Sequence, residues 1–197
     1  MKLIFATNND HKAREIRFAI GEGFEILTLK EAGIFEDIPE PFDTLEENAT
    51  EKSMTIYRLT GNNCFSEDSG LETDALNGEP GVRSARYAGD GRSADDNMDL
   101  LLDNLYGQGN RRARFRTVIS LVIDGTEHQF EGVCEGQIAL ARQGTGGFGY
   151  DPVFIPQGSA RSFGEMDLRE KDQYSHRARA TAKLVAFLNN LYTKQGI

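Results

Sequence analysis

Two adjacent carboxylates stand in the segment SEDSGL, residues 66–71, where a short apolar run ends. Glu67 and Asp68 can hold Mg²⁺, which takes one or two protein carboxylates and completes its shell with phosphate oxygens of a substrate. One of the two can also accept a proton from an attacking water. The alternative is that Asp68, Ser69 and Gly70 form a simple turn, as these residue types readily do. Taken by itself, the segment favours the turn.

The segment ATNNDHK, residues 6–12, joins an apolar run to a helical pattern. A strand-to-helix turn presents backbone N–H groups and the positive end of the helix dipole, which together favour a phosphate. Asn8 and Asn9 add amide donors, and Lys12 adds a cation at the same end of the helix. The P-loop spacing is absent. An ordinary capped helix with a solvated lysine is the alternative.

A helix predicted over residues 45–59 carries charged side chains of two kinds. Lys52 falls beside the apolar stripe of this helix, so it either snorkels to solvent or reaches into a site. Glu47 and Glu51 face away from the stripe and predict a solvated face. Glu40 lies between two prolines in the stiff segment before the helix. The predicted apolar stripe consists of Leu45, Ala49, Ile56 and Leu59.

The segment GGFGYDP, residues 146–152, has the composition of a ligand-binding loop. Glycines such as Gly149 let a backbone approach a ligand closely. Phe148 and Tyr150 offer flat surfaces on which a base can stack, and Asp151 can accept hydrogen bonds from a base edge. A tight turn whose aromatic side chains fill the core is an equally compatible interpretation.

Three cationic residues, Lys171, His176 and Arg177, gather where the last helix is predicted to begin after Ser175. Cations at the start of a helix oppose its dipole, so helix stability does not explain them. They suit an acceptor such as a carbonyl oxygen, although an ordinary surface pair is the alternative. The predicted inward face of this helix is Ala178, Ala182, Val185 and Leu188 or Leu191.

The arginine-rich segment RRARFR, residues 111–116, places Arg112, Arg114 and Arg116 on one strand face. An RNA-binding module built on this face would show steep salt dependence of RNA affinity. The net charge of −9 argues against a general nucleic-acid or anionic-membrane binder, because both need a broad basic surface. A solvated or ion-paired strand face is therefore expected, with no nucleic-acid and no membrane partner.

The composition is that of a globular protein of 197 residues, with 39% hydrophobic and 27% charged residues. Cys64 and Cys134 both lie in apolar strand-like runs, so a disulfide framework is not expected and a reducing compartment fits. The apolar start is too short for a signal or membrane segment. A cytoplasmic location is expected.

The order of elements predicts a mixed α/β sheet flanked by helices. The Asp124-Gly125 pair is a strong hairpin signal between two long β runs. Residues 67–91 are predicted to be a long glycine-rich loop, which in a compact domain tends to be functional or disordered. The predicted strands are 2–6, 24–29, 63–66, 113–123 and 126–142, and the predicted helices are 10–20, 45–59, 93–106 and the one after Ser175.

Five segments, in order and nearly end to end, resemble the inosine triphosphate pyrophosphatase family, also called the non-standard purine nucleoside triphosphate pyrophosphatases or dITP/XTP diphosphatases. They are ATNNDHKAREI, EENATEKS, SEDSGLETDALNGEPGVRSARYAG, GTGGFGYDPVF and EKDQYSHRARA. The resemblance implies an elongated α/β fold with a central mixed β-sheet flanked by helices. It also implies one domain over residues 1–197, in two lobes with the active site between them, and a homodimer.

The activity that the resemblance implies is Mg²⁺-dependent cleavage between the α- and β-phosphates of ITP, XTP and dITP, giving the monophosphate and pyrophosphate. Asp68 resembles the proton acceptor and a metal ligand, and Glu40 the more distant metal ligand. Glu47 and Glu67 stay open as alternatives for that ligand, and Glu67 stands where many relatives have Asp. The residues that resemble the family's substrate contacts are Thr7, Asn8, Asn9, Lys12, Lys52, Ser69, Phe148, Gly149, Tyr150, Asp151, Lys171, His176 and Arg177.

Two other functions compete with this one. The first is a pyrophosphatase for a nucleotide with another base, as in the related Maf-like proteins. The second is a nucleotide-binding sensor that does not hydrolyse its ligand, against which Asp68 argues. Release of pyrophosphate distinguishes an enzyme from a sensor.

Overall fold

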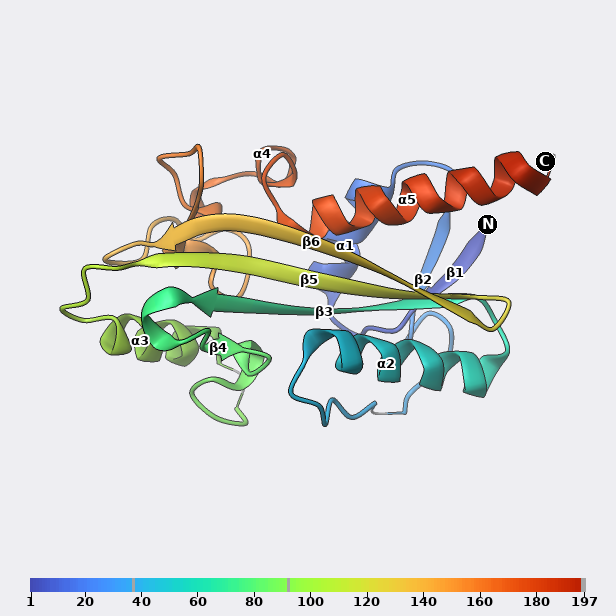
Figure 1. Cartoon of the computed structure of the whole chain (residues 1–197), viewed down its shortest axis with the longest axis horizontal. Coiled ribbons are helices and arrows are strands. Elements are labelled where there is room, and N and C mark those ends of the chain that lie inside the picture. The colour runs from blue at the N-terminus through green and yellow to red at the C-terminus, as the bar shows by residue number, and fades with distance from the viewer. Residues whose placement is uncertain (37, 92, 196–197) are drawn as a thin grey trace. The chain divides into compact units, whose positions relative to one another are not determined.

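The computed structural model describes residues 1–36, 38–91 and 93–195. Their helices and strands alternate along much of the chain (Figure 1). The strands are β1 (Lys2–Phe5), β2 (Glu25–Thr28), β3 (Cys64–Thr73), β4 (Pro80–Gly81), β5 (Arg112–Ile123), β6 (Thr126–Ile138) and β7 (Phe154–Pro156). The α-helices are α1 (Asp10–Ile20), α2 (Leu45–Thr60), α3 (Ala94–Asn104), α4 (Leu168–Asp172) and α5 (His176–Gln195).

The strands form one mixed sheet in the order β2-β1-β3-β5-β6-β7, with β4 paired to β3. Strand β1 runs parallel to both β2 and β3, whereas β3 with β4 and β6 with β7 are antiparallel pairs. Helices flank the strands (Figure 1). The predicted α/β class with a central mixed sheet is therefore confirmed.

The chain divides into two compact units that are not contiguous in sequence. Unit 1 comprises Met1–Asp68, Thr117–Gly132 and Arg177–Ile197, and unit 2 comprises Ser69–Arg116 and Val133–His176. Strands β3, β5 and β6 each contribute residues to both units.

In unit 1, the alternation of side chains along β1 sends buried residues to both faces of the sheet. Leu3 and Phe5 pack with apolar residues of α1 and α5, while Ile4 packs with Ile56 of α2. Helices α1 and α5 thus cover one face, and α2 covers the other (Figure 1). Because both faces are covered, β1 is apolar along its buried length, as parallel strands usually are.

The buried faces of two helices differ from the predicted ones. In α2, Leu59 is 52% exposed, and it lies in the last turn, just before the helix ends at the left-handed C-cap Gly61. In α5, Leu188 is buried and Val185 packs against the core, as predicted, but Ala182 is exposed. The buried face also includes Arg177, Thr181 and Leu184, two of which are polar, so the apolar pattern did not mark them.

The predicted loop over residues 67–91 is wrong in its first part, because β3 continues to Thr73. Ser69 and Gly70 suggested a turn, yet they lie within the strand. A side chain at Gly70 would place its Cβ 2.6 Å from the carbonyl oxygen of Gly81, so glycine lets β4 approach. The hydroxyl of Ser84 accepts a hydrogen bond from Leu71 N at 2.9 Å and closes this contact.

Replacing Gly70 with Ala should lower the free energy of unfolding by about 1–3 kcal/mol, the usual cost of overpacking a tight interior. The new methyl group meets backbone atoms of Gly81, which cannot rotate away. Urea unfolding of the full chain measures the change. Gly109→Ala is the control, because no atom lies within 4 Å of a Cβ at that position. Equal stability of the two variants would contradict the packing argument.

The predicted hairpin between β5 and β6 is confirmed. Asp124 and Gly125 have φ angles of 49° and 81°, the left-handed values that a two-residue turn of this kind requires. Strand β6 ends at Ile138, four residues earlier than predicted. The predicted capping of α3 is also confirmed, since the side chain of Ser93 accepts a hydrogen bond from Asp96 N.

The cysteines are both buried, Cys64 in unit 1 and Cys134 in unit 2. Burial raises the pKa of the Cys64 thiol to about 12, so this side chain stays protonated at neutral pH. A search of the described residues finds no helix with both the length and the apolar character that crossing a membrane requires.

Candidate active site

The turn between β1 and α1 has the capped geometry that the sequence predicts. Asn9 is the N-cap of α1, and its Oδ1 accepts a hydrogen bond from Lys12 N at 3.1 Å. Thr7 Oγ1 accepts one from Asn9 N at 3.1 Å, which fixes the entry to the helix. Asn8 is exposed between them. The turn therefore places the side-chain amides of Asn8 and Asn9 at the positive end of α1.

The side chain of Lys12 points to Glu67, the first acid of the adjacent pair. Lys12 Nζ lies 2.8 Å from Glu67 Oε1. Arg177 binds the same carboxylate from its Nε, 2.8 Å from Oε2, and also pairs with Glu15. Burial alone would raise the pKa of Glu67, but the charges of Arg177 and Lys12 outweigh it and hold that pKa well below its usual range. Glu67 is thus a buried anion between two cations.

The second acid of the pair, Asp68, belongs to a different cluster, centred on Lys52. Lys52 Nζ lies 3.0 Å from Asp68 Oδ1 and 2.7 Å from Glu40 Oε1, and it donates to the carbonyl oxygen of Glu67 at 2.9 Å. The Lys52 side chain is only 8% exposed. Of the two interpretations of Lys52, the structure shows the one in which the side chain reaches into a cluster.

The charges of this cluster set its proton chemistry. Burial lowers the pKa of Lys52, but the carboxylates of Asp68 and Glu40 outweigh burial and raise it. Lys52 stays charged. Burial raises the pKa of Asp68, and the nearby cations Lys52 and Lys12 offset only part of that effect. A carboxylate with a raised pKa is a stronger base than a solvated one, which suits proton transfer from water.

The carboxylates of Asp68 and Glu40 fit a divalent cation that also binds substrate. Both lie within hydrogen-bonding distance of one Lys52 nitrogen, so they converge on one region of unit 1. Glu67 is occupied by its two cations, and Glu47 accepts a hydrogen bond from Thr44 at the exposed start of α2. No group of three or more His, Cys, Asp or Glu that could hold a metal occurs among the described residues. A cation here therefore needs substrate oxygens as well, as Mg²⁺ commonly does.

In unit 2, the glycine-rich segment brings an acid, a cation and an aromatic ring together. Asp151 Oδ2 lies 2.6 Å from Lys171 Nζ and accepts a hydrogen bond from Phe148 N at 2.9 Å. Lys171 Nζ lies 5.0 Å from the centre of the half-buried Phe148 ring, a cation–π distance. A Cβ at Gly147 would lie 2.0 Å from Asp151 Oδ2, so glycine is required for this turn.

Two further predicted residues of unit 2 are buried. The ring of His176 stacks on Phe115 with centres 4.6 Å apart. Tyr150 is 4% exposed and lies in the core, where its hydroxyl donates to the carbonyl oxygen of Ser84 at 2.8 Å. The prediction of Tyr150 as an exposed stacking surface is corrected, because its ring fills the core. Phe148 remains the ring of this segment that is open enough to stack a base.

The family model for the Ham1 family matches residues 3–187 of the chain. The chain belongs to the Ham1 family. It is 52% identical over 188 residues to a dITP/XTP pyrophosphatase of Porphyromonas gingivalis, covering 95% of this chain and 97% of the relative. A dITP/XTP pyrophosphatase of Flavobacterium johnsoniae is 46% identical over 188 residues, covering 95% and 98%. The structure of the Staphylococcus aureus Ham1 protein matches with a TM-score of 0.88 and 36% identity, covering 96% and 99% of the two chains. The family prediction from the five segments is confirmed.

Within this Ham1-family fold, the predicted site residues fall into two sets. The set in unit 1 is Thr7, Asn8, Asn9, Lys12, Glu40, Lys52, Asp68 and Arg177. The set in unit 2 is Ser69, Phe148, Gly149, Tyr150, Asp151, Lys171 and His176. The first set is a cluster of cations and carboxylates, and the second combines a ring, an acid and a cation. Ser69 itself is half-buried within β3.

Two buried polar residues next to the predicted ones, Glu15 and Asn48, were not predicted from the sequence. Glu15 is buried against Arg177, which is 162 residues away in sequence, so no local pattern connects them. Asn48 is 2% exposed and lies on the buried face of α2. Here a signal was present, because a polar residue beside Ala49 interrupts the predicted apolar stripe.

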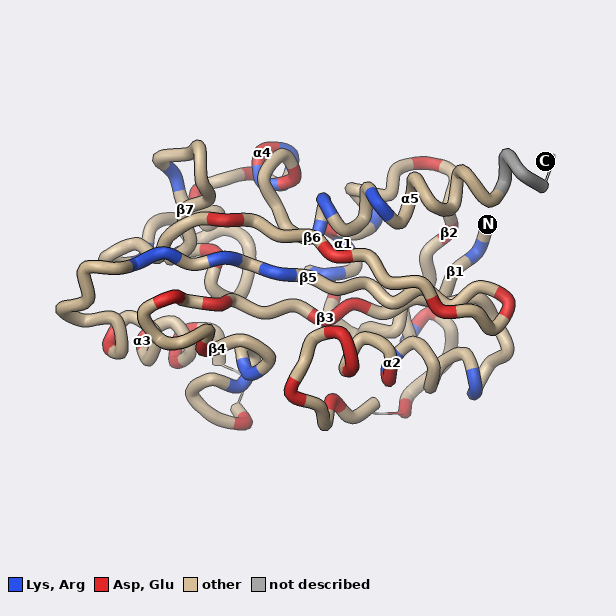
Figure 2. The backbone as a smooth tube through the Cα atoms, viewed as in Figure 1, with Lys and Arg blue, Asp and Glu red and all other residues tan. Residues whose placement is uncertain are grey.

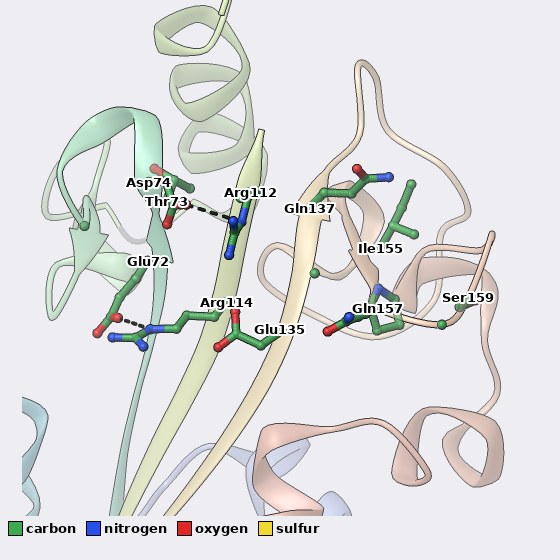
Figure 3. A pocket seen from close by; sticks show the side chains of 14 residues that line it. Glu72, Thr73, Asp74, Arg112, Arg114, Glu135, Gln137, Ile155, Gln157 and Ser159 are labelled. Carbon is green, nitrogen blue, oxygen red and sulfur yellow. Dashed lines mark hydrogen bonds and ion pairs between the residues drawn. The ribbon is translucent and has the colours of Figure 1, made fainter. Parts of the chain in front are cut away.

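The arginine face of β5 is ion-paired, as expected. Arg114 Nε lies 2.7 Å from Glu72 Oε2, and Arg112 lies 3.5 Å from Asp74 (Figure 3). The tube view shows the basic positions of β5 next to acidic positions of β3 (Figure 2). These side chains line an open groove of about 870 Å³ in unit 2 that contains none of the predicted site residues. Because these arginines pair with neighbouring acids, this strand face is explained as a solvated, ion-paired face.

Proposed function

We propose that this protein hydrolyses the non-standard purine nucleoside triphosphates ITP, dITP and XTP to the monophosphate and pyrophosphate. The observation that carries the proposal is the buried cluster in which Lys52 contacts both Glu40 and Asp68. A triphosphate hydrolase needs cations for the phosphates and a carboxylate to accept a proton from water. The names of the Porphyromonas and Flavobacterium relatives support the substrate class.

The turn before α1 binds the phosphate chain in this proposal. The side-chain amides of Asn8 and Asn9 donate to phosphate oxygens at the positive end of α1, with Thr7 holding the turn in shape. The ammonium group of Lys12, which pairs with Glu67, can move to a phosphate oxygen instead. Glu67 keeps its bond to Arg177 when Lys12 moves, so no unpaired buried anion results.

Asp68 accepts the proton of the attacking water. Lys52 holds Asp68 Oδ1 in place. Asp68 and Glu40 are the residues that would hold Mg²⁺. The metal, when bound, neutralises charge on the phosphate oxygens. Lys52 contributes a second phosphate contact from the same cluster.

The residues of unit 2 recognise the base in this proposal. Phe148 stacks on the base, and the backbone at Gly149 approaches it closely. Asp151, Lys171 and His176 supply the polar contacts, together with Arg177. Cationic donors favour a carbonyl at the 6-position over the amino group of adenine. Guanine has that carbonyl too, so Asp151 and the shape of the pocket must provide the remaining discrimination.

The resemblance suggests that a single nucleotide uses both sets of residues. The resemblance further suggests a homodimer, which light scattering of the purified chain tests, and a cytoplasmic location, which the two buried thiols support.

The experiment that tests the function is release of pyrophosphate with Mg²⁺ across a panel of purine and pyrimidine triphosphates. We expect kcat/KM to be highest for ITP, dITP and XTP. Comparable kcat/KM for ATP and ITP would refute the proposed specificity. A preference for another base would favour a Maf-like pyrophosphatase, and binding without release would favour a sensor.

Replacing Lys12 with Ala should raise KM for ITP markedly. The lysine contacts phosphate charge in ground and transition states alike, so KM changes more than kcat. Loss of a charge-assisted contact is worth roughly 1.5–3 kcal/mol, or about tenfold to somewhat over a hundredfold. Steady-state kinetics measures the change, with the exposed Lys30→Ala as a control of the same unit. An unchanged KM and kcat in Lys12→Ala would mean that the turn is an ordinary helix cap.

A further inference from the structure

We propose that Asn48 is a positioning residue that holds the segment carrying Glu40 against Lys52. The proposal rests on the function proposed above. Asn48 itself contacts neither Asp68 nor a phosphate in this assignment. It acts through the backbone of Phe42, two residues after Glu40.

The contact between Asn48 and Phe42 uses both polar atoms of one side-chain amide. Asn48 Oδ1 accepts a hydrogen bond from Phe42 N at 3.0 Å, and Asn48 Nδ2 donates to Phe42 O at 2.9 Å. The Asn48 side chain is buried, so solvent does not compete for these bonds. A pair of bonds to one residue fixes the direction of the backbone as well as its position.

The segment that Asn48 holds has few means of holding itself. Residues 39–43 form neither helix nor strand. Pro39 and Pro41 have no backbone N–H, so two donors that could anchor the segment are missing. The Glu40 side chain is 28% exposed, which means that packing alone does not confine it.

Asn48 and Lys52 lie four residues apart and therefore project from the same face of α2. Lys52 binds the side chain of Glu40, and Asn48 binds the backbone of Phe42. Two successive turns of α2 thus bind the same short segment, one at the side chain of Glu40 and the other at the backbone of Phe42. Lys52 supplies the charge, and Asn48 supplies the position that brings the Glu40 carboxylate to the Asp68 side of the cluster.

The chain offers a matched control in Asn97 of α3. Asn97 is 4% exposed and binds the backbone of residues 85–88 with both polar atoms of its amide. Its Oδ1 accepts a hydrogen bond from Ala88 N at 2.7 Å, and its Nδ2 donates one to Ala85 O at 3.2 Å. Its loop carries no residue of the proposed site. Asn48→Ala and Asn97→Ala therefore both remove a buried anchoring amide, but only the first is expected to change the carboxylate cluster.

The test compares the two variants in metal binding and in turnover. Mn²⁺ binding to the full chain in the presence of a non-hydrolysable ITP analogue is followed by electron paramagnetic resonance, and the Mg²⁺ concentration for half-maximal ITP hydrolysis is measured in parallel. Loss of a residue that orients a metal ligand typically costs about 10–100-fold in metal affinity or activity. We expect a loss in this range for Asn48→Ala, with KM for ITP at saturating Mg²⁺ within about threefold of the parent. Asn97→Ala should bind both metals like the parent.

A double-mutant cycle with Glu40→Gln shows whether Asn48 acts through Glu40. Once Glu40 has lost its charge, adding Asn48→Ala should weaken metal binding no further. Hydrogen exchange gives a readout that needs no metal. The exchange rate of the Phe42 amide should rise in Asn48→Ala and stay at the parent value in Asn97→Ala. Additive effects in the cycle, or equal metal affinity in the two Asn variants, would overturn the inference.

The same set of variants separates the inference from the proposed function. If the parent releases pyrophosphate and Glu40→Gln impairs it while Asn48→Ala does not, the inference alone fails. If the parent releases none from any triphosphate, the proposed function fails. Hydrogen exchange at the Phe42 amide then still decides whether Asn48 holds the segment that carries Glu40.

Discussion

Replacing Asp68 with Asn should lower kcat for ITP by about 10²–10⁴, the range for loss of a general base, with weakened metal binding adding to the loss. Asn cannot accept the proton of the attacking water, and its amide is a poorer cation ligand than a carboxylate. The fold should survive the change. Lys52 keeps its contacts with Glu40 and with the carbonyl oxygen of Glu67, so the buried cation stays paired.

The measurement is kcat at saturating Mg²⁺, with a melting curve for each protein. Asp103→Asn on the exposed face of α3 is the control for the chemical change itself. A folded Asp68→Asn variant that works within about tenfold of the parent, below the general-base range, would refute the role of Asp68. Glu40 would then be the carboxylate to replace next, since it shares the Lys52 nitrogen.

Replacing Lys52 with Met should destabilise the protein far more than replacing Asp68. Removal of Lys52 leaves the carboxylates of Asp68 and Glu40 facing one another without their shared cation. Breaking a buried ion pair by removing one partner typically costs about 3–5 kcal/mol. Met has nearly the volume of the lysine stem, so the loss reports charge rather than a cavity. Urea unfolding without divalent cations measures it.

Lys2→Met is the matched control for Lys52. Lys2 pairs with Glu25 at 3.5 Å, but both side chains are more than half exposed, and such pairs contribute about 0–1 kcal/mol. The double variant Lys52→Met with Asp68→Asn should be more stable than Lys52→Met alone, because one of the two facing carboxylates is gone. Equal stability of Lys52→Met and Lys2→Met would contradict the buried cluster.

The features that sequence predicted well are local ones. The capped start of α1, the Ser93 cap and the Asp124-Gly125 turn each depend on a few neighbouring residues, and each is present in the structure. The sequence left Asn8, Asn9 and Asp10 open as the cap of α1, and the structure shows Asn9. Lys52 also carried a local signal, since a charged residue beside an apolar stripe has to find a partner. The mixed character of the sheet also followed from the order of these elements.

The features that sequence predicted poorly depend on residues far apart in the chain. The extension of β3 through Gly70 needs Gly81 as its neighbour, and nothing around Gly70 announces that contact. The burial of Glu67 between Lys12 and Arg177 likewise depends on distant residues, since Arg177 lies 110 residues after Glu67 in the sequence. The segment around Tyr150 did not decide between a stacking surface and the core, because the core that receives this ring is built from other segments.

The pairing of Arg177 with Glu15 and Glu67 has a consequence for the synthesis of the chain. Arg177 follows these acids by 162 and 110 residues, so both carboxylates leave the ribosome long before their cation does. Until then, unit 1 lacks the partner that makes burial of Glu67 favourable, and it also lacks α5. A polypeptide interrupted before Arg177 therefore leaves part of its core open to proteases and chaperones, as incompletely folded chains do. The core of unit 1 can therefore close only after Arg177 and the helix that carries it have been synthesised.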